Sequence, residues 1–107
     1  MDIVVPLIKS GPNAGKPRQL NEVLLSRISA VRDVLIKVRN SGYLATDIRL
    51  DGVRPSIVLE YHDDFSRLVD EGVACYYIWQ SDPRGVPERL GQFHVDGVRL
   101  IWRERGH

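Results

Sequence analysis

The chain has 107 residues, the size of a single domain with one hydrophobic core. Its 43% apolar and 27% charged residues are typical of a soluble globular protein and exclude a chain that is disordered throughout. Fifteen basic and fourteen acidic side chains give a net charge of +1, which disfavours a dedicated nucleic-acid binder, because such proteins are usually far more basic. We therefore expect one folded domain over residues 1–107, with any charge-driven function arising from local clusters.

The composition also predicts a compartment. Cys75 is the only cysteine, so no intramolecular disulfide can form, and a reducing intracellular compartment is the simpler prediction. The N-terminal residues 1–6 carry an acid where a secretory signal peptide has Lys or Arg. No stretch reaches the roughly 18 apolar residues that a membrane-spanning helix needs. The sequence therefore predicts a cytoplasmic protein.

A short strand and a loop are the first elements expected in chain order. Residues Ile3–Ile8 predict the strand, and Ser10–Arg18, rich in Gly, Pro and Asn, predict the loop. Gly11–Lys16 lies where a phosphate-binding loop would stand between a strand and a helix. It has three rather than four residues between its glycines, and Pro17 replaces the Ser or Thr that would hold magnesium. We expect a loop without a phosphate site.

A long amphipathic helix follows this loop. Apolar residues recur there with the period of one helix face, at Leu24, Ile28, Val31, Leu35 and Val38. Asn21 is the predicted N-cap, and Leu20 and Leu25 are expected to form a hydrophobic staple across it. Gly42 is expected to end the helix, because glycine readily adopts the left-handed conformation found at helix C-termini.

Two Asp-Gly pairs, each followed by Val-Arg, predict two β-hairpins with two-residue type I′ turns. The first turn joins Tyr43–Leu50 to Val53–Tyr61, which would place Arg49 directly opposite Arg54. We attribute the repeated letters to turn chemistry rather than to a duplication.

The second hairpin is centred on Asp96 and Gly97 and has two distinct faces. Its apolar face carries Phe93, Val95, Val98, Leu100 and Trp102. Its polar face, interrupted by Ile101, carries Gln92, His94, Arg99, Arg103 and Arg105.

Residues 62–72, between the hairpins, predict two turns of helix that Asp63 or Asp64 would cap and Gly72 would end. Val73–Gln80 is apolar on both faces, which favours a central strand covered on both sides, with an interface strand as the alternative. The expected order is β-α-β-β-α-β-β-β. These periods indicate an α+β fold, a two-layer sandwich in which an antiparallel sheet of about five strands carries the long helix on its apolar face.

The residue pattern predicts no metal, cofactor or complete catalytic site. His62, Asp63 and Asp64 are adjacent and cannot converge on a metal by themselves, and the helix N-terminus explains both acids. Cys75 and His94 are the one candidate for a nucleophile and its base. Because no oxyanion donors or positioning acid accompany them, a buried structural thiol is the favoured interpretation of Cys75.

The polar side of the two hairpins is the surface predicted to bind a partner. Its binding residues are Arg49, Arg54, His94, Arg99 and Arg103, with Arg105 beside them. A solvated face neutralised by Asp47, Glu60 and Glu104 is the alternative. Sheets that bind nucleic acid usually add aromatic stacking platforms, and here only Tyr76 or Tyr77 is available on that side. This favours a protein partner over nucleic acid.

The strand at Val73–Gln80 is a second candidate surface. Exposed aromatic and apolar residues anchor many interfaces, so Tyr76 and Ile78 are candidate interface residues, including for a homodimer.

The functional hypothesis that follows is a non-enzymatic protein-binding module, acting as an inhibitor or adaptor of a partner protein. A short chain with arginine-rich hairpins and no catalytic signature is similar in general character to accessory proteins of bacteriophages and bacterial mobile elements, although no motif carries that likeness. Nucleic-acid binding through the same basic face is the first alternative. A small enzyme using Cys75 and His94 is the second.

Overall fold

The computed structural model describes residues 15–106, with side chains described from residue 19 onward. Its elements are α1 (Gly15–Asn40), β1 (Ala45–Arg49), β2 (Ser56–Leu59), α2 (Asp64–Asp70), β3 (Cys75–Ser81), β4 (Pro87–Val95) and β5 (Val98–Arg105). The predicted strand Ile3–Ile8 and residues 10–14 of the predicted loop lie outside the described residues. From residue 15 onward, the predicted order of helices and strands is confirmed.

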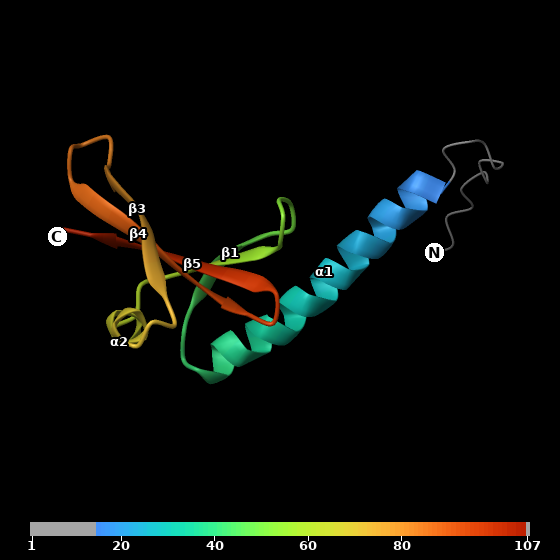
Figure 1. Cartoon of the computed structure of the whole chain (residues 1–107), viewed down its shortest axis with the longest axis horizontal. Helices are drawn as coiled ribbons and strands as arrows, with labels where there is room; N and C mark the ends of the chain where they lie inside the picture. The colour runs from blue at the N-terminus through green and yellow to red at the C-terminus, as the bar shows by residue number, and fades with distance from the viewer. Residues whose placement is uncertain (1–14, 107) are drawn as a thin grey trace.

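The fold is α+β, as predicted: five strands form one sheet in the order β1-β2-β5-β4-β3, and both helices lie on one side of it (Figure 1). Three neighbouring pairs are antiparallel, but β2 and β5 are parallel, so the sheet is mixed rather than wholly antiparallel. Antiparallel neighbours need only a short turn, whereas α2, β3 and β4 all lie between β2 and β5 in the chain. That connection is long enough for a parallel pair.

The core lies between the helices and the sheet. From the second half of α1, Val31, Val34 and Val38 are buried against a cluster that includes Ile57 of β2 and Leu100 of β5. These contacts explain the apolar stripe of the helix and the apolar face of the strands. They also hold α1 on one face of the sheet only.

α1 begins at Gly15, well before the predicted N-cap Asn21, so the predicted start of the helix was wrong. Pro17 is compatible with this longer helix, because the N–H groups of the first turn have no acceptor within the helix. Leu20 and Leu25 are both exposed and form no staple. The first half of α1 projects past the sheet (Figure 1). No helix within residues 15–106 combines the length and apolarity needed to cross a membrane.

α2 covers the other end of the same sheet face. Phe65 is fully buried, and its ring centroid lies 4.7 Å from that of Trp102. Gly72 follows the helix with a φ of 76°, as predicted for its end. Asp63 is the N-cap residue, one of the two predicted, but its side chain makes no capping hydrogen bond. Nδ1 of His62 instead accepts a hydrogen bond from the Asp64 N–H at 3.0 Å.

The second hairpin has the predicted type I′ turn. Asp96 has a φ of 49° and Gly97 a φ of 80°, and Val95 faces Val98 across the turn. The side chain of Lys37, at the end of α1, forms an ion pair with Asp96 and so links the helix to this turn.

The first hairpin does not have the predicted two-residue turn. In this connection only Gly52 has a positive φ, and Arg49 faces Ser56 rather than Arg54. Residues 50–55 therefore form a longer loop between β1 and β2. Pro55 cannot donate a ladder hydrogen bond, and its carbonyl instead accepts the N–H of Arg99 in β5, at 2.9 Å.

Arg27 of α1 gives a physical reason for this loop. Its guanidinium donates hydrogen bonds to the carbonyl oxygens of Leu50, Gly52 and Val53, at 2.6, 2.8 and 3.1 Å. A tight type I′ turn would not present these three carbonyls together to the helix. A tertiary contact therefore overrides the local turn preference of Asp51 and Gly52.

β3 is an edge strand, so the predicted central strand was wrong. Among the strands within residues 15–106 it pairs only with β4, and Ile78 and Trp79 are exposed. A bulge between Tyr76 and Ile78 shifts the register of the strand. The apolar residues at both odd and even positions of β3 are therefore explained by this bulge and by the exposed edge, not by burial of the strand on two sides.

Candidate binding surface

The sheet face opposite α1 and α2, called the outer face below, has an apolar floor. Side chains alternate between the two faces along a strand, so Val58 of β2, Leu90 of β4 and Ile101 of β5 point away from the helices. Val58 faces Ile101 in the β2–β5 register, and Leu90 faces Arg103 in the β4–β5 register. The three floor residues therefore lie on three neighbouring strands.

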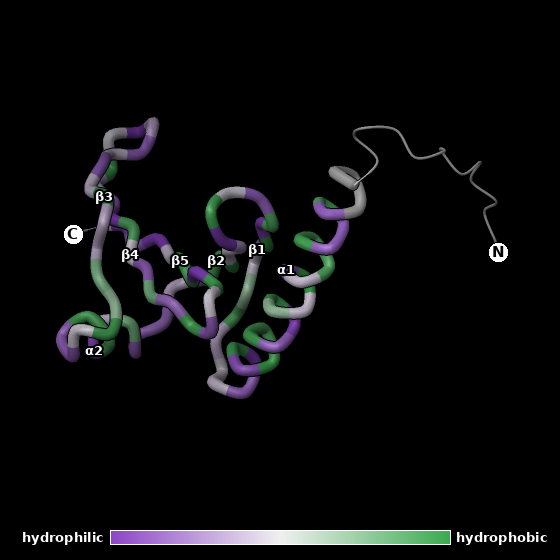
Figure 2. Tube along the Cα trace, turned by 45° about the vertical axis from the view of Figure 1, so that its right-hand side comes forward, coloured by the Kyte–Doolittle hydropathy of each residue, from purple (hydrophilic) through white to green (hydrophobic). Residues whose placement is uncertain are grey.

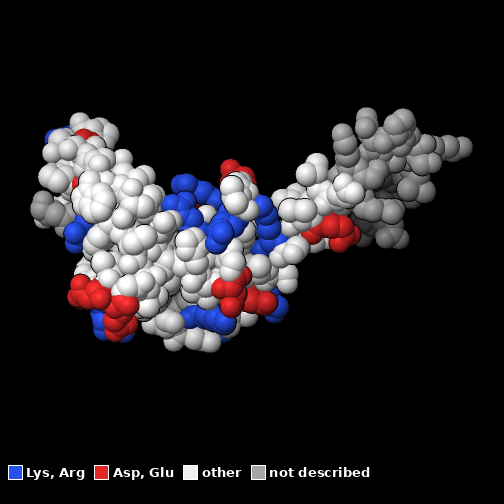
Figure 3. All heavy atoms as spheres, in the orientation of Figure 1, with Lys and Arg blue, Asp and Glu red and all other residues white. Residues whose placement is uncertain are grey.

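The outer face is also hollowed. A cavity of about 750 Å³ is lined by the three floor residues together with Arg49, Tyr77, Arg103 and Arg105. Arg49 comes from the edge strand β1 and Tyr77 from the opposite edge strand β3. Figure 3 shows Lys and Arg side chains gathered in the hollow between the β3–β4 end of the molecule and the β1–β2 loop. The floor is thus apolar. Its surroundings carry both signs of charge, because Asp47 and Glu60 line the same cavity as Arg49, Arg103 and Arg105.

Two arginines at this hollow share one carboxylate. The Nε atoms of Arg103 and Arg105 each lie 3.4 Å from Oε2 of Glu88, whose side chain is only 4% exposed. Both arginine side chains remain about half exposed. One buried acid therefore positions two cations, and the group carries an excess of one positive charge.

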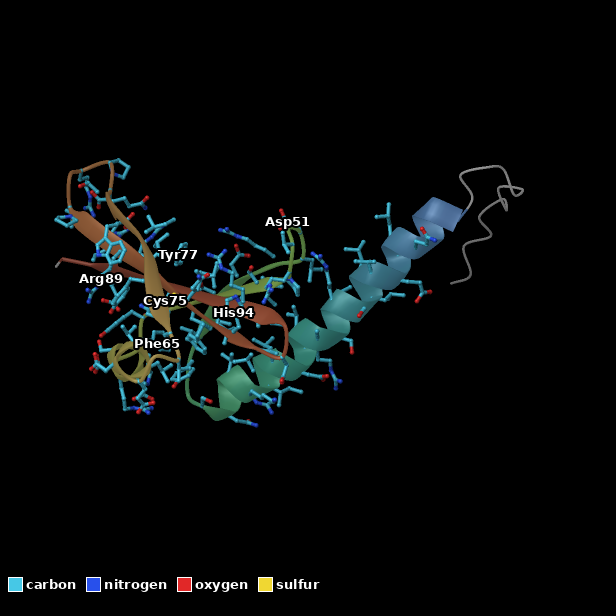
Figure 4. The ribbon with its side chains drawn as sticks, in the orientation of Figure 1. Asp51, Phe65, Cys75, Tyr77, Arg89 and His94 are labelled. Atoms are coloured by element: carbon cyan, nitrogen blue, oxygen red, sulfur yellow. The ribbon has the colours of Figure 1, made fainter. Side chains whose placement is uncertain are left out.

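Arg99 is held by neutral groups on the same face. Its Nε donates a hydrogen bond to Oε1 of Gln92. Its guanidinium carbon lies 4.6 Å from the ring centroid of Tyr77, which Figure 4 labels on β3. A cation over an aromatic face is attracted by the ring quadrupole, but the ring does not cancel its charge. Arg99 therefore adds to the positive charge of the outer face.

The remaining predicted binding residues are less closely grouped. Arg49 lies at the hollow, 3.7 Å from Asp47, with both side chains well exposed. His94 faces Arg99 across β4 and β5. Arg54 lies in the β1–β2 loop and does not face Arg49, because the predicted turn does not form. The structure thus brings Arg49 and Arg103 to one hollow, places Arg99 and His94 on the same sheet face, and leaves Arg54 in the loop.

Cys75 is exposed, so the expectation of a buried structural thiol was wrong. It faces Gln92 across β3 and β4, and its sulfur accepts a hydrogen bond from Nε2 of Gln92 at 3.9 Å. His94 stands two residues further along β4, in a diagonal position for which Cα separations are typically about 7–8 Å. Figure 4 labels both residues on their separate strands. The described contacts of Cys75 are with Gln92, not with His94.

Tyr76, a predicted interface residue, belongs to the helix side of the sheet. Its hydroxyl donates to Oε1 of Glu104 at 2.9 Å, and the guanidinium of Arg89 lies 3.8 Å from its ring centroid. Ile78, the second predicted interface residue, lies at the exposed edge, beside the more exposed Trp79. The exposed apolar surface of β3 is therefore formed by Ile78 and Trp79.

One alternative drawn from the sequence was that Glu104 helps to neutralise the outer face. Glu104 cannot do so, because it lies on the helix side of the sheet and is buried. Burial by itself would raise the pKa of Glu104. Hydrogen bonds from Trp102, Tyr76 and Arg89 outweigh that effect and keep the pKa below its usual range. Oε1 accepts from Nε1 of Trp102 at 2.8 Å, and Oε2 accepts from Nε of Arg89 at 3.0 Å. This network is a structural feature of the fold.

The sequence pattern missed how the outer face is built. Ile101 and Val58 read as isolated apolar exceptions among polar residues, yet parallel pairing of β2 with β5 places them side by side. Glu88 gives no signal in the sequence, because its role depends on lying beside Arg103 and Arg105 across a strand pair. The two apolar exceptions were only a weak signal, since single apolar residues are common on protein surfaces and only a contiguous patch marks an interaction site.

The chemistry available at the outer face is recognition of an anion that also carries an apolar group. Guanidinium groups bind carboxylates and phosphates through paired hydrogen bonds, and the floor offers contact area to aliphatic or aromatic side chains. Within residues 15–106 no group of three or more His, Cys, Asp and Glu side chains is placed to hold a metal ion.

Comparison with known proteins assigns the chain to a family without assigning a function. No curated protein and no solved structure matches it. A family model described as "Uncharacterised protein" matches residues 18–105, which cover nearly all of the described helices and strands. Nothing in that match indicates a catalytic function. The chain therefore belongs to this uncharacterised protein family.

Proposed function

We propose that the protein is a non-enzymatic binding module, and that its outer face receives an acidic segment of a partner protein, as an adaptor or an inhibitor does. The observation that supports this proposal most directly is the hollow with an aliphatic floor, which three arginines and two acids line, so that basic side chains outnumber acidic ones there. A segment with Asp or Glu on either side of a Leu, Ile or Phe matches both parts of that surface. Its carboxylates would meet Arg49, Arg99 and Arg103, while the apolar side chain would lie on Val58 and Leu90, the floor residues that are partly exposed.

The charge balance of the outer face supports an acidic ligand. Glu88 is shared between Arg103 and Arg105, and Arg99 is held by Gln92 and the ring of Tyr77. The arginines are therefore positioned in advance with part of their charge uncompensated. Pre-positioned side chains lose less conformational entropy on binding, which favours affinity.

The floor favours a protein ligand over single-stranded nucleic acid. Nucleic-acid-binding sheets stack bases on exposed aromatic rings. Here the floor residues are Val58, Leu90 and Ile101, and Arg99 already lies over the ring of Tyr77. Aliphatic side chains offer packing to an apolar residue but no stacking platform for a base.

We expect charge reversal at Arg99 and Arg103 to weaken this recognition at least about tenfold. Random peptides displayed on phage, selected against the wild-type protein, should be enriched in segments that combine acidic and large apolar residues. The double variant R99E/R103E should bind the enriched peptides at least about tenfold more weakly, because both changes place a negative charge against the ligand carboxylates. Isothermal titration calorimetry gives the two affinities.

A matched variant controls for net charge. R32E/R39E makes the same change in net charge on exposed positions of α1 and leaves the outer face intact. It should bind the peptides as the wild type does. Equal binding by R99E/R103E, with its circular dichroism spectrum unchanged, would exclude the outer face as the binding surface. Enrichment of peptides without acidic residues would exclude the proposed ligand chemistry.

Single-stranded nucleic acid is the second candidate ligand, because Tyr77 and Arg99 together offer one ring and one cation on the outer face. A fluorescently labelled oligonucleotide tests it. Retention through phosphate contacts would weaken steeply with rising salt, with a slope set by the number of phosphates neutralised. Binding that vanishes in R99E/R103E and follows such a slope would favour nucleic acid over an acidic protein segment.

A further inference from the structure

The half of α1 that projects past the sheet carries an uncovered apolar ridge. Its five residues, called the α1 ridge below, are between 44% and 64% exposed: Leu20, Val23, Leu24, Leu25 and Ile28. Figure 2 shows hydrophobic residues along this half of the helix as well as along the half that meets the sheet. Clustered apolar side chains of this kind on a folded protein mark an interaction surface.

The α1 ridge continues the stripe that forms the core. With 3.6 residues per turn, Leu24 and Leu20 lie on the helix face that carries Val31 and Val38 further along. Val31 and Val38 are 4% exposed, whereas Leu24 is 44% exposed. The same face of one helix is therefore core in its second half and exposed in its first.

The pattern of apolar and polar residues across the ridge is symmetric about Leu24. The segment is residues 19–29, Gln-Leu-Asn-Glu-Val-Leu-Leu-Ser-Arg-Ile-Ser. When each residue is classed as apolar or polar, the order of the two classes is the same from either end of the segment. In an antiparallel pair of such helices, Leu20 would lie opposite Ile28 and Leu24 opposite Leu24. Leu20, Leu24 and Ile28 would then meet apolar counterparts along the line of contact. Val23 and Leu25, about 100° to either side of Leu24, would flank that line.

Charges in this segment agree with the same pairing. The charged residues within 19–29 are Glu22 and Arg27, which would lie opposite Ser26 and Asn21 respectively. No like charges would face each other. Arg27 is also occupied in its own chain, where it binds the carbonyl oxygens of the β1–β2 loop.

We propose that the α1 ridge binds the α1 ridge of a second copy of this chain, antiparallel and around a two-fold axis at Leu24. Leu20, Leu24 and Ile28 are spaced by four residues, and two such rows interdigitate at a crossing angle of about −50°. An isologous contact of this kind uses the same patch on both copies. It shares no residue with the outer face, so both copies would keep their outer faces available.

The size of the surface predicts a weak dimer. Leu20 to Ile28 spans about 12 Å of helix, and this ridge alone offers less than the roughly 800 Å² per partner of a standard interface. Val53, in the loop that Arg27 holds beside α1, is 94% exposed and is a further apolar residue next to this part of the helix. We therefore expect the dimer to dissociate on dilution through the micromolar range.

Sedimentation equilibrium of the full chain tests the proposal. The wild type should approach twice the chain mass at about 300 µM and approach the monomer at about 3 µM. L24E should be monomeric throughout, because the two-fold axis brings the two new carboxylates together. S29E adds the same charge on the side of the helix away from Leu24, where the pairing places the uncharged Gln19 opposite it, and should dimerise as the wild type does. A wild-type protein that is monomeric at the highest concentration, or an L24E variant that still dimerises, would overturn the proposal.

Cysteine cross-linking tests the antiparallel arrangement and does not depend on the behaviour of L24E. Because Cys75 is exposed, each variant carries C75S. Under mild oxidation L24C should form disulfide-linked dimers with itself. L20C should link to I28C in a mixture, and each should link poorly to itself. Efficient self-linking of L20C would show a parallel pair, and absence of any link in L24C would place the contact elsewhere; either result contradicts the proposed arrangement.

Discussion

Gly91→Ala should destabilise the fold by about 3 kcal/mol or more, the upper range for overpacking a buried site. Gly91 is buried in β4, directly opposite Trp102 in β5. A Cβ atom at this position would lie 2.1 Å from Cζ2 of Trp102, and 2.4 and 2.5 Å from Cη2 and Cε2. The indole cannot withdraw easily, because Trp102 is only 1% exposed and contacts Phe65. For a domain of this size the melting temperature should fall by more than about 10 °C.

The substitution Trp102→Phe tests whether this clash is the cause. Phenylalanine lacks the part of the indole that an added Cβ would meet, so Gly91→Ala should cost much less in the W102F background than in the wild type. The two substitutions should therefore be strongly non-additive in the free energy of unfolding, as expected for residues in contact. Urea denaturation of the four proteins gives the coupling energy. An additive result would show that Gly91 is required for a reason other than the indole.

Glu104→Gln should cost about 3 kcal/mol at neutral pH, because it removes one partner of a buried, hydrogen-bonded ion pair. Glu104 accepts hydrogen bonds from Trp102, Tyr76 and Arg89, and its side chain is 6% exposed. A glutamine of the same size would present an N–H₂ group to these donors or leave one of them without an acceptor. The guanidinium of Arg89 would also lose its counter-charge in a site with little solvent.

The cost of Glu104→Gln should depend on pH. Hydrogen bonds from Trp102, Tyr76 and Arg89 outweigh burial and lower the pKa of Glu104 in the folded state. A group with a lowered folded pKa contributes stability above its unfolded pKa and loses it as the pH falls through the folded pKa. The difference in unfolding free energy between wild type and E104Q should therefore be largest at neutral pH. It should shrink as the pH falls below the usual pKa range of a glutamate.

Urea denaturation at pH 7 and at about pH 3 measures this difference, since the carboxylate of an unfolded glutamate titrates between these values. E71Q is the matched control: Glu71 pairs with Arg67 on the surface of α2, four residues apart, with both side chains half exposed or more. It should change stability little at either pH. An E104Q variant as stable as E71Q would show that the buried network does not stabilise the fold.

The fold could be predicted from the sequence where local signals agree with the tertiary contacts. The second hairpin illustrates this, because its Asp-Gly turn and its alternating strands indicate the same register, and the structure has that register. The first Asp-Gly pair shows the limit. There the guanidinium of Arg27, more than twenty residues earlier, binds three loop carbonyls and replaces the turn that its sequence favours.

The parts of the surface that were not predictable depend on which strands become neighbours. β5 lies next to β2, and no local pattern encodes that parallel pair. Val58 and Ile101 therefore could not be recognised as one floor. Similarly, the sequence of β3 predicts a central strand, because apolar residues occupy both its odd and its even positions. In the structure, a bulge and an edge position account for this pattern. Gly91 was predictable only in part, since a glycine within a strand indicates close approach of another group without identifying Trp102.

Methyl NMR spectra during titration with an acidic peptide enriched by the phage selection test the central claim most directly. Three pairs of residues, each pair of one amino-acid type, report on the two faces of the sheet. They are Ile101 and Ile57, Leu90 and Leu100, and Val58 and Val98. The first member of each pair lies on the outer face and the second in the core. If the outer face is the binding surface, the methyl signals of Ile101, Leu90 and Val58 shift with the peptide while their core counterparts change little. Shifts confined to the core residues or to the α1 ridge would contradict the proposed function.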